Sequence, residues 1–217
     1  MKLTTEQIEC INQTLIKKGI KYDDIKIEVI DHIASEIEFE METNQKPFLE
    51  AFQQVFDRWK PDFELTRAYF SLATYYPKLA RTKFGNQLKL ELITAIAISL
   101  VLILSFQLLP DSNARFQFIF WIKKVFFYAY FGTVGSMLIL KFLNTKSKIS
   151  STYKQTFDGR FAAFIVCLGM VFNDNIPQEA TNQNLFVLMI GIYMSFLMST
   201  IYLGFKHYQF QRKFFIQ

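Results

Sequence analysis

The 217-residue sequence has only two cysteines and two histidines, which narrows the chemistry that it can perform. Cys10 and Cys167 are far apart, unlike the closely spaced cysteines of a disulfide framework or a zinc site. We therefore expect both to be small buried apolar residues. The sequence shows no Ser/His/Asp set, phosphate-binding loop or glycine-rich nucleotide motif. We therefore expect neither an enzyme nor a bound cofactor or metal.

Charge is unevenly distributed along the chain. Residues 1–60 contain 8 basic and 12 acidic residues, whereas residues 61–217 contain 16 basic and 7 acidic residues. Long apolar runs in the basic part indicate a membrane-flanking bias, and the net acidic first part argues against direct nucleic-acid binding. The start of the sequence lacks the pattern of a cleavable signal peptide, so the first apolar run is expected to act as an uncleaved anchor.

Residues 1–80 show helical patterns and no strand-like alternation, which predicts a small all-α cytoplasmic domain. Thr4 and Gln7 form a capping-box pattern, and the helix that follows is expected to stop at Gly19. Further helices are expected over residues 22–42, 47–60 and 63–76, with Pro61 and Pro77 as breaks.

The helix over residues 22–42 has an apolar stripe and an opposite face that is nearly all acidic. His32 lies between Glu28 and Glu36, at i−4 and i+4. This face has four open interpretations: a metal stripe, an acid–base site, a solvated face, or a docking surface for a basic partner. This part of the chain lacks the Glu-x-x-His spacing of di-iron sites, a second histidine and a recognisable nucleophile, which disfavours the first two interpretations. Our hypothesis is a docking surface, whose members would be Glu28, Asp31, His32, Ser35 and Glu36.

Three features resemble the HAAS-type helical domain of small bacterial membrane proteins. They are the capped first helix, the segment VIDHIASEIE at residues 29–38, and the phenylalanine-rich AFQQVF at residues 51–56. The resemblance covers about residues 4–80. It implies a signalling role beside a PadR-like transcription regulator, and it supplies no catalytic residues.

Residues 81–217 are predicted to form a four-helix membrane domain with a short basic cytoplasmic tail. A bilayer core needs about 20 helical residues, and the candidate runs cover about residues 88–109, 116–143, 157–176 and 185–205. The loop at residues 173–184 has no Lys or Arg. Basic residues flank the other side, at Lys78, Arg81, Lys83, Lys146, Lys148, Lys154, Arg160, Arg212 and Lys213. Both termini are therefore expected on the cytoplasmic side of a bacterial inner membrane, with these residues at the lipid surface.

The paired Lys123 and Lys124 interrupt the second run. Residues 116–124 either lie along the outer surface as an interfacial helix, or belong to one long tilted helix whose lysines face a wet interior. Glu91 is expected at an end of the first span, within reach of solvent or headgroups.

Small residues recur at four-residue spacing within the runs and predict close helix contacts. These helix-packing candidates are Gly132, Ser136, Gly191, Ser195 and Ser199. They serve either packing within this bundle or self-association into a homo-oligomer.

These patterns favour a multi-pass regulatory or adaptor protein whose acidic helix binds a cytoplasmic protein. The alternative is an accessory or assembly subunit of a membrane transport or secretion complex, in which the spans carry the function. We also expect the acidic helix to be able to dock on the basic residues that flank the spans.

Overall fold

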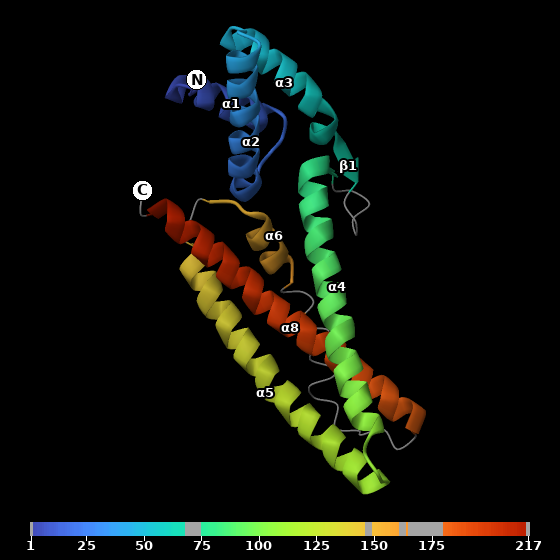
Figure 1. The fold of residues 1–217 in the computed structure, drawn as a ribbon. Helices are drawn as coiled ribbons and strands as arrows, with labels where there is room; N and C mark the ends of the chain where they lie inside the picture. The colour runs from blue at the N-terminus through green and yellow to red at the C-terminus, as the bar shows by residue number, and fades with distance from the viewer. Residues whose placement is uncertain (1, 68–74, 146–148, 161–163, 165–179, 216–217) are drawn as a thin grey trace. The chain divides into compact units, whose positions relative to one another are not determined.

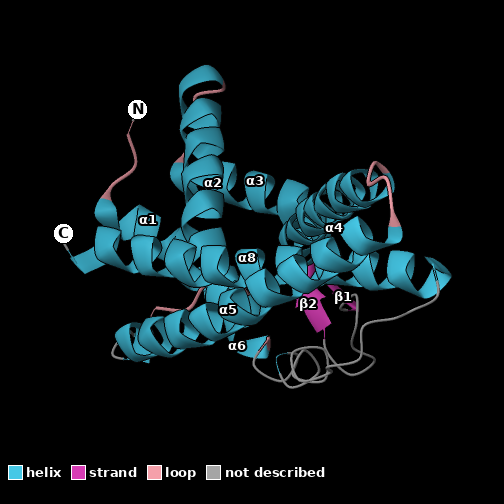
Figure 2. Ribbon diagram, turned by 90° about the horizontal axis from the view of Figure 1, so that it is seen from below, coloured by secondary structure: helices cyan, strands magenta, loops and turns pink. Residues whose placement is uncertain are grey.

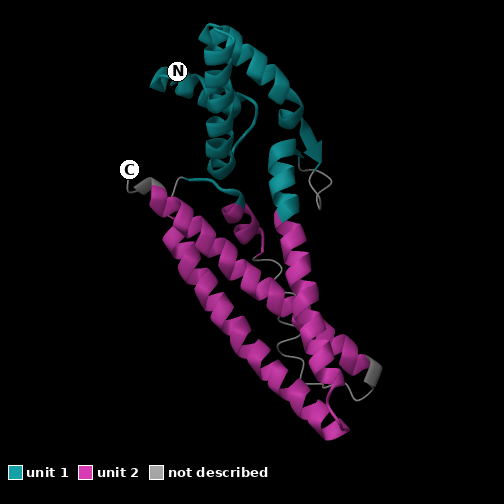
Figure 3. Ribbon diagram, in the orientation of Figure 1, with its two compact units in different colours: residues 1–86, 149–152 teal, residues 87–148, 153–217 magenta. Residues whose placement is uncertain are grey.

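The computed structural model describes residues 2–67, 75–145, 149–160, 164 and 180–215, and helices dominate this part of the chain (Figure 1). The all-α prediction is therefore confirmed. The chain forms two compact units, residues 1–86 with 149–152 and residues 87–148 with 153–217 (Figure 3). The helices are α1 Thr5–Lys17, α2 Asp23–Thr43, α3 Phe48–Phe63, α4 Lys78–Gln107, α5 Ser112–Thr145, α6 Thr152–Gly159 and α8 Ala180–Phe215, and the strands are β1 Leu65–Arg67 and β2 Tyr75–Pro77.

The first helix begins and ends as its sequence predicts. The backbone N–H of Thr4 donates to Gln7 Oε1 over 2.8 Å, and Thr4 Oγ1 accepts from the Gln7 backbone N–H over 3.3 Å. This is the reciprocal capping box. After α1, Gly19 has a φ of 85°, a left-handed conformation that glycine adopts without a Cβ penalty.

The core of the first unit lies along the apolar stripe of α2. Ile33 and Ile37 are fully buried, and so are Ile11 and Leu15 of α1 and Val55 of α3. The α2 helix contacts both α1 and α3. The apolar stripe of α2 packs against α1 and against α3, so the opposite surface of α2 faces outward.

Two boundaries differ from the predictions. The α3 helix continues through Pro61 to Phe63, because a proline near a helix end removes one hydrogen bond of the last turn without displacing a long following segment. The expected helix over residues 63–76 is wrong at both of its described ends. There, β1 and β2 (Figure 2) pair antiparallel. Thr66 lies opposite Tyr76 in this pairing. Aromatic and β-branched residues favour this extended pairing.

The second unit contains long helices of the kind that cross membranes. Among the described residues, α4, α5 and most of α8 are long and apolar enough to span a bilayer, by length and composition. The α5 and α8 helices pack along each other (Figure 1) and share a core that includes Phe126, Tyr130, Met137 and Leu197. The predicted span at residues 157–176 lies outside the described residues except for the end of α6, Arg160 and Phe164.

The α5 and α8 helices are each longer than the spans that the sequence predicts. The α5 helix is continuous from residue 112 to 145, so the segment with the paired lysines is not a separate helix. The Lys124 side chain is exposed, with Nζ 4.5 Å from the centre of the Phe120 ring. The α8 helix continues through the expected tail to Phe215, and His207 within it is fully buried.

Replacing a buried residue of the α2 stripe should destabilise the first unit far more than the same change on the exposed face. We expect Ile33→Ala to lower the free energy of unfolding by about 2–5 kcal/mol, because a fully buried side chain leaves a cavity. Ile27→Ala, on the same helix at a position 41% exposed, should change it by less than about 0.5 kcal/mol. Urea denaturation of the full chain in detergent, followed by hydrogen exchange of α2 amides, measures both. Equal losses for the two variants would contradict this account of the core.

Candidate functional site

The outward face of α2 carries most of the predicted docking residues. Glu28, Asp31, His32 and Ser35 are exposed on it. Phe39, one turn further along, is 62% exposed. The sequence interpretation missed Phe39, although its position four residues after Ser35 places it on the same face. The face therefore combines carboxylates with an aromatic side chain open to contact.

Glu28 and Glu36 differ from the other members because side chains of the same unit already bind them. Lys83 Nζ lies 3.0 Å from Glu28 Oε2, so one of the predicted flanking basic residues contacts the acidic helix. Arg58 Nη2 lies 3.1 Å from Glu36 Oε2, and Trp59 Nε1 donates to Glu36 Oε1 over 2.9 Å. Glu36 therefore helps to hold α3 against α2.

Glu40 extends this connection between the two helices. Its carboxylate accepts from Arg58 Nη1 over 2.7 Å and from Asn44 Nδ2 over 2.6 Å. These hydrogen bonds, with a smaller contribution from Lys46, lower the pKa of Glu40 to about 2. The same contacts raise the pKa of the Arg58 guanidinium, chiefly through its hydrogen bond to Glu40. The predictions did not include Glu40 or Arg58.

The amino-terminal end of α2 binds a segment that is distant in the sequence. The Asp23 backbone N–H donates to the Ser150 carbonyl over 2.7 Å, and the Ser150 N–H donates to Asp23 Oδ2 over 2.8 Å. Buried Asp24 accepts from the Thr152 backbone N–H over 3.0 Å and from its hydroxyl over 2.5 Å. Residues 149–152 are thereby part of the first unit, and Thr152 is also the first residue of α6.

In the second unit, a carboxylate and a guanidinium meet between membrane-type helices. Arg160 is 7% exposed, and its Nη2 lies 2.5 Å from Glu91 Oε1 on α4. Its Nη1 donates to Thr200 Oγ1 over 3.0 Å, and its guanidinium carbon lies 4.9 Å from the centre of the Phe196 ring. Ser199 Oγ also donates to Glu91 Oε1, over 2.9 Å. Glu91 and Arg160 thus join α4, the end of α6 and α8.

The small residues of α8 face α4. A Cβ on Gly191 would lie 2.8 Å from Ser99 Cα, so the two backbones approach too closely for a side chain. Ser195 Oγ lies 3.1 Å from Thr94 Oγ1, and Ser199 binds Glu91. These three residues line one contact between antiparallel helices.

Gly132 and Ser136 have a different environment on α5. Apart from the neighbouring residues and nearby backbone of α5 itself, no described atom lies within 4 Å of a Cβ placed on Gly132, and Ser136 Oγ donates to the Gly132 carbonyl over 2.8 Å. Their use in self-association stays a prediction.

The predicted basic lipid-surface residues lie in different environments. Arg212 and Lys213 are exposed near the end of α8, and Lys78 is exposed with its Nζ 3.5 Å from Asp62 Oδ1. Arg81 and Lys154 are half-buried. Lys146 and Lys148 lie outside the described residues, whereas Lys83 and Arg160 make the ion pairs given above.

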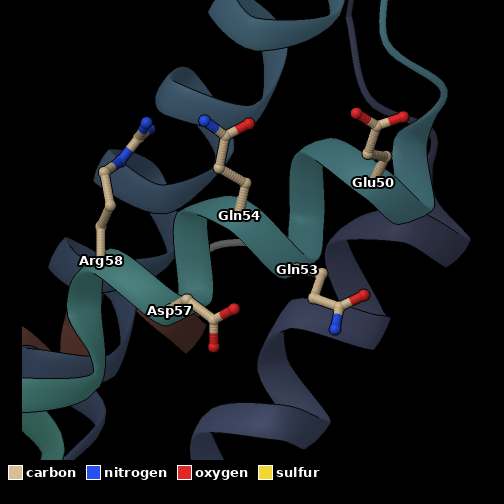
Figure 4. Close-up of a pocket in the computed structure, with 5 residues that line it drawn as sticks. All are labelled: Glu50, Gln53, Gln54, Asp57 and Arg58. Carbon is tan, nitrogen blue, oxygen red and sulfur yellow. The ribbon is translucent and has the colours of Figure 1, made fainter.

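A further pocket lies on α3. Five side chains of that one helix line this pocket, and Figure 4 draws them: Glu50, Gln53, Gln54, Asp57 and Arg58. In the part of the chain that the structure describes, no group of three or more His, Cys, Asp or Glu residues could hold a metal ion. Cys10 is exposed, contrary to the expectation of burial, because it lies on the outer face of α1, and Cys167 falls outside the described residues.

Comparisons of the chain with protein-family models, curated proteins and solved structures find no match. The resemblance to HAAS-type domains therefore stays a prediction.

Acid should weaken the connection between α2 and α3 through Glu40. Its folded-state pKa of about 2 lies below the ordinary value of 4.5, so its contribution to stability is present above about pH 4.5 and is lost as the pH falls toward 2. We expect the difference in free energy of unfolding between the wild type and Glu40→Gln to be constant at neutral pH and to shrink over that range. Denaturation of the full chain at a series of pH values measures it. The control Glu50→Gln removes an exposed carboxylate of α3, and a matching pH dependence there would argue against a specific role for Glu40.

Adding one methyl group at Gly191 should disturb the contact between α4 and α8. We expect Gly191→Ala to destabilise the second unit by about 1–3 kcal/mol, because Ser99 backbone and side-chain atoms occupy the space. Gly132→Ala meets no described atom and should be neutral, or stabilising by up to about 1 kcal/mol through helix propensity. Thermal unfolding midpoints in detergent compare the two. A stable Gly191→Ala variant would show that the helices separate without cost.

Proposed function

We propose that this protein is a membrane-anchored regulatory or adaptor protein whose acidic α2 face binds a basic surface of a cytoplasmic partner. The observation that carries the proposal is the exposed combination of Asp31, His32 and Phe39 on one side of a helix whose other side is fixed in the core. The resemblance to HAAS-type domains suggests a transcription regulator as the partner.

The chemistry of this face suits regulated protein binding better than catalysis. Carboxylates speed and orient the approach of a positively charged partner. An exposed aromatic ring supplies apolar contact area, which is the usual source of binding energy at the centre of an interface.

The fixed geometry of α2 supports the proposal, because a preformed surface binds with a smaller ordering cost. Glu36 and Glu40 hold α3 through Arg58 and Trp59, and Asp23 and Asp24 hold residues 150–152. Glu28 is shared with Lys83, so a basic partner would compete with that lysine for it. This competition offers a route by which the first turns of α4 would regulate access to the acidic face.

In the proposed location, a bacterial inner membrane, four spans would place both termini and α2 on the cytoplasmic side. The second candidate function, an accessory subunit of a membrane transport or secretion complex, draws support from the partly buried Glu91–Arg160 pair. Ionisable groups between membrane helices are expensive and usually functional. Replacing the spans with an unrelated anchor separates the two candidates, because adaptor binding would survive it.

Crosslinking from native membranes tests the docking surface. We expect the triple variant Asp31→Ala, His32→Ala, Phe39→Ala to lose a cytoplasmic protein that the wild type captures, because these side chains are exposed and their removal leaves the core intact. The matched control Glu50→Ala, Gln53→Ala, Asp57→Ala removes exposed polar groups of α3 and should retain it.

The captured protein is then purified and its binding to the full chain measured at low and high salt. Affinity that falls with salt in the wild type and loses most of that dependence in the triple variant fits a basic partner. Capture of the same integral membrane proteins by all three chains would favour the accessory-subunit function instead.

A further inference from the structure

A cavity of about 400 Å³ lies between α4 and α8, wholly within the second unit. Its volume falls in the usual range of small-molecule sites. Its α4 wall covers the twelve residues from Gln87 to Ile98, which corresponds to about 16 Å along the helix. The cavity is therefore long enough to take an extended molecule lengthwise.

The lining of the cavity is mostly apolar. Its apolar side chains include Leu90, Ile98, Met198 and Leu203, its hydroxyl groups include those of Thr94, Ser195 and Ser199, and Glu91 is its charged residue. The α4 and α8 helices are antiparallel here, with Glu91 beside Ser199 and Thr94 beside Ser195, and Ile98 lies about two helical turns beyond Glu91. An apolar lining that contains one carboxylate matches an amphiphile, whose polar headgroup meets Glu91 while its hydrocarbon part contacts the apolar side chains.

The headgroup chemistry follows from Glu91. Of the charged residues that the structure describes, Glu91 is the one that lines this cavity. Arg160, Ser199 and Gln87 all donate to its Oε1, and no described group donates to Oε2. A carboxylate oxygen in this position selects a hydrogen-bond donor and disfavours an anion. A primary ammonium group supplies both positive charge and N–H donors.

We propose that this cavity binds an amphiphile with a primary ammonium headgroup, which is held by Glu91 while its hydrocarbon part contacts Ile98 and Met198. Two sources share this chemistry, the phosphatidylethanolamine of the bilayer and a free long-chain amine. The site is independent of the α2 docking surface, so either proposal can fail without the other.

Native mass spectrometry of the full chain in detergent tests the site. The probe is an equimolar mixture of phosphatidylethanolamine, phosphatidylcholine and phosphatidylglycerol with identical acyl chains. We expect the protein to retain about ten times more phosphatidylethanolamine than phosphatidylcholine. Phosphatidylcholine has no N–H donor, so it cannot form the charged hydrogen bond to Glu91. Glu91→Gln should abolish this preference.

A second variant keeps the Glu91–Arg160 pair intact, in case Glu91→Gln fails to fold. Met198→Trp places a large ring in the cavity and should lose the bound lipid. The control Val101→Trp adds the same ring at an α4 position that is 63% exposed, and it should retain the lipid.

A separate arm uses dodecylamine without lipid. One outcome is that the wild type retains dodecylamine, Met198→Trp does not, and the wild type shows no preference for phosphatidylethanolamine. That outcome would identify a free amine as the ligand. Equal retention of all three lipids with no retention of dodecylamine would overturn the proposal. So would binding that Met198→Trp leaves unchanged.

Discussion

Burial of the α2 stripe between α1 and α3 is the contact on which the first unit depends. Ile33 and Ile37 have no exposed surface, and the helices on either side are short. A small unit has little other apolar area to bury, so rotation of α2 about its axis would expose much of the core. The stripe therefore also determines which residues face outward. The acidic face of α2 is a consequence of core packing as much as of its own sequence.

Charged residues are used in two ways in this molecule. Glu36 and Glu40 meet Arg58 at the contact between α2 and α3, where hydrogen bonds to the charged forms add direction to an otherwise apolar contact. Glu91 and Arg160 meet between membrane-type helices, where each would be costly without the other. Asp31 and His32 are left on the surface. Distinguishing paired from available charge changes which residues are candidates for partner binding.

The two proposals assign different surfaces to different units. Asp31, His32 and Phe39 offer an exposed face that suits a protein partner, whereas the cavity beside Glu91 suits a small amphiphile. The segment at residues 149–152 belongs to the first unit and is continuous in the chain with α6 of the second.

The sequence by itself determined the helical elements of the first unit and the long apolar runs of the second, because capping and hydrophobic periodicity are local properties. Thr4, Gly19 and the stripe through Ile33 and Ile37 could be identified in this way. Local patterns failed at residues 65–67 and 75–76, where cross-strand pairing such as that of Thr66 and Tyr76 decided the conformation. Only the tertiary structure decided that Glu36 binds Arg58 and that Arg160 reaches Glu91, since these partners are 22 and 69 residues apart. Spacing along a helix shows which face a charge occupies, but its partner comes from whichever distant element packs there.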